Sequence, residues 1–125
     1  MDANRFFSVP YDNRNDTRIL RLRRREGGMA AYGRWVALLG MLYDEHGLLD
    51  LNDDDTMWMV SRELELDDVN GYMESLASVG LIDMELWSAF RHVVNDGVCD
   101  EIEYRRAKSE AGKKGTAKRW SKEKK

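Results

Sequence analysis

The chain of 125 residues contains one cysteine, one proline and two histidines, and this scarcity argues against several kinds of site. Cys99 cannot form a disulfide within the chain, and the neighbouring Asp100 and Glu101 disfavour a thiolate, so we interpret it as a reduced structural residue. His46 and His92 lie far apart with no further ligand at metal spacing, so we expect neither a metal nor another cofactor. No Cys–His or Ser–His pairing can be argued, and we expect that the protein is not an enzyme.

Long apolar runs are also missing from the sequence. No segment approaches the roughly 18 apolar residues that a membrane span needs, and Asp2, Asn4 and Arg5 stand where a signal peptide would be apolar. We therefore expect a cytoplasmic protein with no membrane partner.

The 42% of hydrophobic residues suffice for one hydrophobic core, so the sequence predicts one domain over residues 1–110. Residues 111–125 form a basic tail that we expect to be disordered or marginally helical.

The net charge of -3 hides a strong segregation of charge along the chain. Residues 1–25 carry 7 basic and 3 acidic groups, residues 26–103 carry 3 and 18, and residues 104–125 carry 10 and 2. An acidic body between two basic ends suggests that the ends make any contact with nucleic acid. The alternative is that a basic tail only keeps the protein in solution.

The first expected helix, Thr17–Arg25, has Asp16 as a plausible N-cap and ends at Gly27. At about 100° per residue, four of its arginines fall within an arc of about 120°, opposite the leucine and isoleucine side chains. These four are Arg18, Arg21, Arg24 and Arg25. Arg23 falls within the apolar arc, so we expect its stem to lie along the core and its guanidinium to meet a carboxylate of the body.

The remaining pattern predicts helices and short strands in a recognisable order. The expected helices are Met29–Glu45, Asp53–Leu64, one capped by Asp67 that ends at Gly80, and one from Val98; the expected strands are Leu48–Leu51, Leu81–Ile82 and Arg91–Val94. Residues 84–90 would form a wing or a short helical insert. The order is typical of a mainly α fold: a winged helix-turn-helix with an extra helix at each end and a small β-hairpin wing.

The opening FFSVPYDNRNDTRILRLRRREGGMAAYGRWVALLGMLYDEHGLLDL resembles the N-terminal domain of phage replisome organisers related to DnaD, and AGKKGTAKRW resembles the linker that follows that domain. With the helix-turn-helix, the similarity covers about residues 6–120. It implies a winged-helix domain that takes part in initiating phage or plasmid DNA replication through self-association and DNA contact, with other replication proteins as candidate partners. Proteins of that family commonly continue into a second, C-terminal domain. The resemblance is to the N-terminal domain, so the helicase-loading role of the family is not extended to this sequence.

The helix expected after Asp67 does not look like a reader of the major groove. Over Asp67–Val79 it contains the carboxylates of Asp67, Asp68 and Glu74 and no Lys or Arg, which opposes its approach to two phosphate backbones. We interpret Asn70 and Ser75 as solvated surface residues. Phosphate contacts are instead predicted for nine basic residues at the two ends: Arg18, Arg21, Arg24, Arg25, Arg105, Lys113, Lys114, Lys118 and Arg119.

Two functions stay open on the sequence alone. The first is a DNA-binding accessory or initiation protein that contacts phosphates non-specifically through its basic ends. The second is a protein-interaction or oligomerisation module on a winged-helix scaffold that does not bind DNA itself. Whether the two basic ends form one patch would discriminate between them. Trp35, Trp58 and Trp87 add more apolar surface than a small body readily covers, so we also expect a homodimer.

Overall fold

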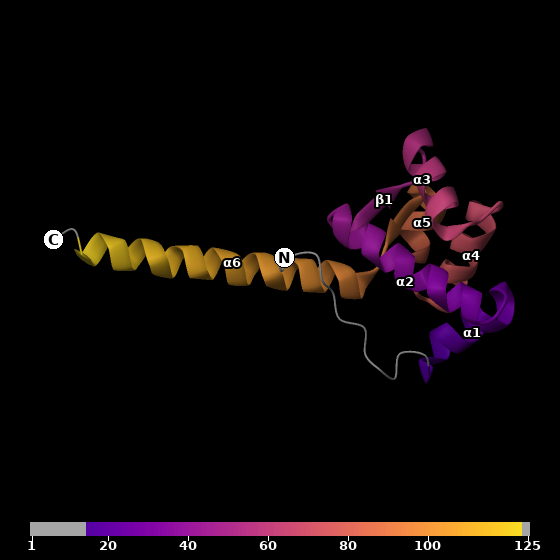
Figure 1. Ribbon diagram of the computed structural model, residues 1–125, viewed down its shortest axis with the longest axis horizontal. Coiled ribbons are helices and arrows are strands. Elements are labelled where there is room, and N and C mark those ends of the chain that lie inside the picture. Colours follow the sequence, from indigo (N-terminus) through magenta and orange to yellow (C-terminus); the bar gives the residue numbers. More distant parts are fainter. Residues whose placement is uncertain (1–14, 124–125) are drawn as a thin grey trace.

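The computed structural model describes residues 15–123, with side chains described as far as Glu110. Helices dominate this part of the chain, and a long terminal helix points away from a folded body (Figure 1). The elements are α1 (Thr17–Glu26), α2 (Met29–Asp44), β1 (Leu48–Asp50), α3 (Asp54–Leu64), α4 (Val69–Val79), α5 (Met84–Phe90), β2 (His92–Val94) and α6 (Asp96–Glu123). The expectation of a mainly α fold with a small sheet is confirmed.

Aspartates begin four of these helices. Asp16, Asp53 and Asp83 each accept a hydrogen bond from a main-chain N–H in the first turn of α1, α3 and α5, respectively. Helix α4 is capped by Asp68, one residue after the expected Asp67. Such caps satisfy N–H groups that have no partner inside the helix, which is why the starts of α1, α3 and α4 could be read from the sequence to within about a residue.

The strand pairing differs from the expected hairpin wing. β2 pairs with β1 in antiparallel register, with Leu49 opposite Val93. The expected hairpin of Leu81–Ile82 with Arg91–Val94 is wrong, because Leu81 and Ile82 are buried in the core and do not form a strand. The next residue, Asp83, donates its main-chain N–H to the Val94 carbonyl at 2.8 Å. Of the two alternatives expected for residues 84–90, a wing or a short helical insert, the structure has the helix, α5.

Helix α2 runs through the body and organises the core. It contacts α1, α3, α6 and β1, and it buries Ala31, Trp35, Leu38 and Leu42. Helix α4 lies against α1, and the buried Tyr72 hydroxyl of α4 donates to the Ala31 carbonyl of α2 at 2.9 Å. The α1–α2–α4 packing therefore fixes which face of α1 points outward.

Glu65 ends α3 in the left-handed region, with φ 54° and ψ 49°. A side chain costs about 1–2 kcal/mol in that conformation, whereas glycine adopts it readily. We expect Glu65→Gly to raise the free energy of unfolding by about 0.5–1 kcal/mol, measured by urea denaturation, since the greater freedom of glycine in the unfolded chain offsets part of the gain.

Gly80 ends α4 in the same left-handed conformation, with φ 86°, but here the residue is already glycine, so the substitution is made in the opposite direction. A Cβ atom there would meet its nearest neighbour, Arg18 Cδ, at an ordinary 3.7 Å, so Gly80→Ala would suffer conformational strain without a clash. It should lower the free energy of unfolding by about 1 kcal/mol or more. Destabilisation by both substitutions would contradict this account of the two caps.

Candidate nucleic-acid interface

Helix α1 presents three arginines to solvent. Ile19 and Leu22 face the core and are fully buried, which turns Arg21, Arg24 and Arg25 outward as exposed side chains. Among the residues that the structure describes, none forms an ion pair or a hydrogen bond with these three guanidiniums. They therefore form a cationic face that is available to a partner, which we call the arginine face.

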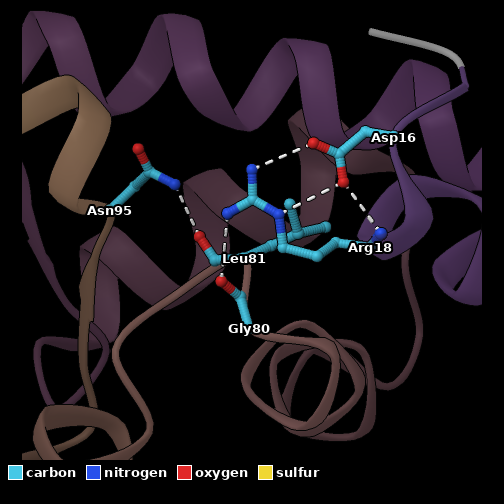
Figure 2. A network of polar contacts seen from close by, with 5 residues as sticks. All are labelled: Asp16, Arg18, Gly80, Leu81 and Asn95. Carbon is cyan, nitrogen blue, oxygen red and sulfur yellow. Dashed lines mark hydrogen bonds and ion pairs between the residues drawn. The ribbon is translucent and has the colours of Figure 1, made fainter.

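Arg18 has a different environment from the other three predicted arginines of α1. Its Nη2 lies 3.1 Å from Asp16 Oδ2, its Nε donates to Asp16 Oδ1, and its Nη1 donates to the Gly80 carbonyl at 3.4 Å (Figure 2). The next carbonyl, that of Leu81, accepts from the Asn95 side chain. Arg18 thus ties the start of α1 to the end of α4, and we leave it out of the arginine face.

The Arg18 side chain also holds the pKa of the Asp16 carboxyl below its ordinary value, mainly through their hydrogen bond. A carboxyl whose pKa is lowered by folding stabilises the fold above its unfolded pKa, and this contribution is lost as the pH falls through the folded pKa. Asp16→Asn should cost about 0.5–1 kcal/mol at pH 7, the range of an exposed ion pair. In urea titrations, the difference from the wild type should begin to shrink as the pH falls below about 4, near the unfolded pKa, and should be lost only below the still lower folded pKa.

Asp67→Asn is the control for that experiment, because Asp67 is exposed near the start of α4 but does not cap it. It should change the free energy of unfolding at pH 7 by less than about 0.5 kcal/mol, because it removes a surface charge without removing a cap. An Asp16→Asn variant whose deficit persisted undiminished at pH 3 would show that the carboxylate charge does not stabilise α1.

Arg23 departs from its expected surroundings. Its side chain is half-buried, as anticipated for a residue in the apolar arc, but its Nε is buried without a hydrogen-bond acceptor among the described residues. The expected pairing with a body carboxylate is therefore not found there. Glu26, one turn further along α1, accepts instead from the Ser75 hydroxyl of α4. Arg23 consequently contributes to the packing of α1 and not to its exposed cationic face.

The two polar residues of α4 that the sequence offered as base contacts, Asn70 and Ser75, are both engaged within the protein. Asn70 Oδ1 accepts from Arg91 Nη1 at 2.7 Å, and Ser75 donates to Glu26. Both side chains are half-buried, so their interpretation as solvated surface residues is wrong. The error arose because both partners come from other elements, α1 and the C-cap of α5, which sequence spacing does not reveal.

Replacing either residue of α4 by alanine should therefore leave DNA affinity nearly unchanged while lowering stability. We expect Asn70→Ala and Ser75→Ala each to cost about 0.5–1.5 kcal/mol of unfolding free energy through the lost hydrogen bond. Their affinities for duplex DNA, measured by fluorescence anisotropy, should stay within about twofold of the wild type. A loss of binding above about 1.5 kcal/mol, the range of a good base contact, would show that α4 reads bases.

The structure also assigns a role to Arg34, which stood out in the sequence only as a lone charge within an apolar helix. Its Nε donates to the Leu64 carbonyl at 2.7 Å, and its Nη2 lies 3.5 Å from the Glu65 carbonyl. A cation at these carbonyls satisfies the end of α3 and complements its dipole. Arg34 is thus a structural cap that joins α2 to α3.

The second basic region lies on α6. Arg105 pairs with Glu101, with Nε 3.1 Å from Oε1, and its guanidinium lies 5.3 Å from the centre of the Tyr43 ring on α2. Arg105 therefore helps to anchor α6, besides being a predicted phosphate contact. The other predicted contacts on this helix lie outside the described side chains: Lys113, Lys114, Lys118 and Arg119. The backbone of α6 continues as a helix through Glu123, where the sequence led us to expect disorder or marginal helix.

The basic end of α6 extends away from the body that carries the arginine face (Figure 1). The arginine face belongs to the helix that precedes the start of α2, whereas Arg105 contacts Tyr43 near the end of α2. The start of α1 lies near the start of α6, because Arg18 and Asn95 donate to the adjacent carbonyls of Gly80 and Leu81 (Figure 2). From its contact with α2, α6 then runs away from the body (Figure 1). A ligand must therefore span a long distance to contact both the arginine face and the basic end of α6 in one molecule.

Cys99 lies in a packed environment between α6 and the turn before β1. Its Sγ is 3.8 Å from the Gly47 carbonyl oxygen. Burial raises the pKa of the thiol, and the carboxylates of Asp96, Asp100 and Glu103 raise it further. These surroundings disfavour the reactive thiolate and agree with the structural role expected for this residue.

Comparisons with known proteins place the chain in a family without adding an activity. In the described part of the chain, no helix is both long and apolar enough to cross a membrane. No curated protein and no solved structure matches the sequence. Residues 6–98 match the family described as Lin1244/Lin1753-like, N-terminal, and this description does not mention replisome organisers or DnaD. Since the match spans most of the 125 residues, the chain belongs to the Lin1244/Lin1753-like N-terminal family.

Proposed function

We propose that this protein is a DNA-binding accessory or initiation protein of phage or plasmid replication that holds DNA by its phosphates. The observation that carries the proposal is the arginine face of α1, where Arg21, Arg24 and Arg25 are exposed and lack partners among the described residues. Guanidinium groups bind phosphate oxygens through paired hydrogen bonds. Their clustering on one face of an otherwise acidic protein favours an anionic ligand.

The architecture of the body supports contact with the phosphates of DNA without recognition of its bases. We interpret α3, the turn at residues 65–68 and α4 as a helix-turn-helix in which α5 takes the place of a hairpin wing. The second helix of this motif buries six side chains, and its Asn70 and Ser75 are hydrogen-bonded within the protein. The motif therefore serves as a scaffold that holds α1 in place, and the DNA contacts are independent of base sequence.

Helix α6 supplies a second and separate contact. Residues 104–125 contain 10 basic and 2 acidic groups, and the helix extends beyond the acidic body (Figure 1). Basic residues on such an extension can follow a phosphate backbone at a distance from α1. Two separated cationic regions suit a protein that contacts long DNA at two positions.

The second candidate function is a protein-interaction module without intrinsic DNA binding. The observation that favours it is the course of α6 away from the body (Figure 1), because the charges at its basic end then do not add to those of the arginine face in a single patch. The exposed Trp58 and Met59 on α3 also favour contact with another protein.

A salt series on the intact protein tests the proposed function. If the two regions neutralise about six phosphates, a plot of log affinity against log salt should have a slope near -5 on duplex DNA. Fluorescence anisotropy with a labelled duplex of random sequence, between about 50 and 300 mM salt, would measure this slope. Absence of binding at about 50 mM salt would contradict DNA binding and favour the interaction module.

A further inference from the structure

The outer face of α3 exposes large apolar side chains. Trp58 is 60% exposed and Met59 is 46% exposed, although both belong to a helix whose opposite face is buried. A hollow of about 90 Å³ lies beside Met59, between α3, β1 and the end of α2. Its lining consists of Met41, Asp44, Glu45, Leu49, Thr56 and Met59. We call Trp58, Met59 and this hollow the α3 face.

Most of the charged side chains beside the α3 face are carboxylates. Asp54 and Asp55 lie one turn before Trp58 on the same side of the helix, and Asp44 and Glu45 lie at the rim of the hollow. Arg62, one turn after Trp58, lies over the Trp58 ring at 5.3 Å from its centre, so four carboxylates and one cation border this face. An exposed tryptophan beside charged residues has the composition of a binding site for another protein. The negative charge of the rim selects a cationic partner.

The same sequence contains a segment with the required chemistry. Residues 104–125 carry 10 basic and 2 acidic groups and include the aromatic residues Tyr104 and Trp120. Tyr104, on the described part of α6, is 63% exposed. The backbone of α6 is one continuous helix that points away from its own body (Figure 1), so it does not fold back onto its own α3.

We propose that the α3 face of one copy of this chain binds the basic segment of α6 from a second copy. The complementary charges of the two surfaces, on an acidic body and a basic extension, carry this assignment. The proposal names an interface for the homodimer expected from the sequence. It is independent of DNA binding by α1, but DNA and the α3 face would compete for the basic residues of α6.

Light scattering and sedimentation on the full chain would test this association. At tens of micromolar protein, we expect association at 50 mM salt and dissociation by about 500 mM, since screening weakens charge attraction. Trp58→Ala should weaken association at least tenfold while leaving the melting temperature close to that of the wild type. Phe90→Ala is the control, because Phe90 is similarly exposed but lies at the end of α5.

A mixing experiment would show whether the contact joins two different copies. The second component is the full chain with Lys113, Lys114, Lys118 and Arg119 all replaced by glutamine. This variant and Trp58→Ala should each associate weakly alone, but a mixture should associate more strongly, since one supplies an intact α3 face and the other an intact α6. Monomeric wild type at 50 mM salt, an unchanged affinity of Trp58→Ala, or no gain on mixing would each overturn the proposal.

The two proposals can fail separately in these measurements. A wild-type protein that binds duplex DNA with a steep salt slope but stays monomeric would retain the proposed function and lose the α3–α6 interface. A protein that associates through Trp58 but binds no DNA would retain the α3–α6 interface and lose the proposed function. Changing Trp58 leaves the arginine face intact, because Trp58 belongs to α3 and the arginine face belongs to α1.

Discussion

Replacing Arg21, Arg24 and Arg25 together by glutamine is expected to weaken binding to duplex DNA by at least about a hundredfold at 0.1 M salt. Each neutralised phosphate contributes about 0.9 to the magnitude of the salt slope, so the loss of three contacts should reduce the slope by about 2.7. The three side chains are exposed and make no described contact within the protein, so the fold should be unaffected. Anisotropy titrations at several salt concentrations would measure both effects.

Arg62→Gln and Arg91→Gln, combined in one variant, provide the control. Arg62 lies over the Trp58 ring, and Arg91 lies over the Trp87 ring and donates to Asn70, so each is already engaged within the body. Removing these two charges should change the salt slope by less than about 1. If both variants lost affinity equally, binding would depend on overall charge and not on the arginine face of α1.

The helix boundaries followed from the sequence because their causes are local. An aspartate cap satisfies main-chain N–H groups only two or three residues away, as Asp16, Asp53 and Asp83 do. Gly27 and Gly80 end α1 and α4 in the left-handed conformation that glycine tolerates. The spacing of apolar residues then determines which face of each helix is buried, including the outward direction of the arginine face.

The strand pairing could not be predicted in the same way, because its causes are distant in the sequence. Leu48–Asp50 and His92–Val94 pair across more than 40 residues, and alternation alone does not identify a partner strand. Leu81 and Ile82 have the composition of a strand, but they enter the core instead of extending alongside β2. Asp83 then caps α5, which replaces the expected turn of the wing.

The candidate site could be predicted only as far as its residue types. Segregated charge indicated that the basic ends are the candidate contacts, and the structure presents Arg21, Arg24 and Arg25 to solvent. The internal roles of Arg18 and Arg34 depend on carbonyls at the ends of other helices, more than 25 residues away. Counting charges along the chain also could not show that α6 runs away from the body that carries α1 (Figure 1).

The attachment of the arginine face to the body is expected to depend strongly on one leucine. Leu22 is fully buried, and with Ile19 it forms the apolar side of α1 that packs against α2 and α4. Leu22→Ala should lower the free energy of unfolding by about 2.7–5 kcal/mol, because truncation removes buried apolar atoms and leaves a cavity. Urea denaturation monitored by tryptophan fluorescence would measure the loss.

Leu20→Ala is the matched control, since Leu20 lies on the same helix but is 45% exposed. Alanine loses little buried surface there and has a high helix propensity, so the change should stay within about 0.5 kcal/mol. While folded, Leu22→Ala should retain the salt slope of the wild type, because its three exposed arginines are unchanged. A folded Leu22→Ala protein with a slope smaller by about 2.7 would show instead that DNA binding requires α1 to be held rigidly against α2 and α4.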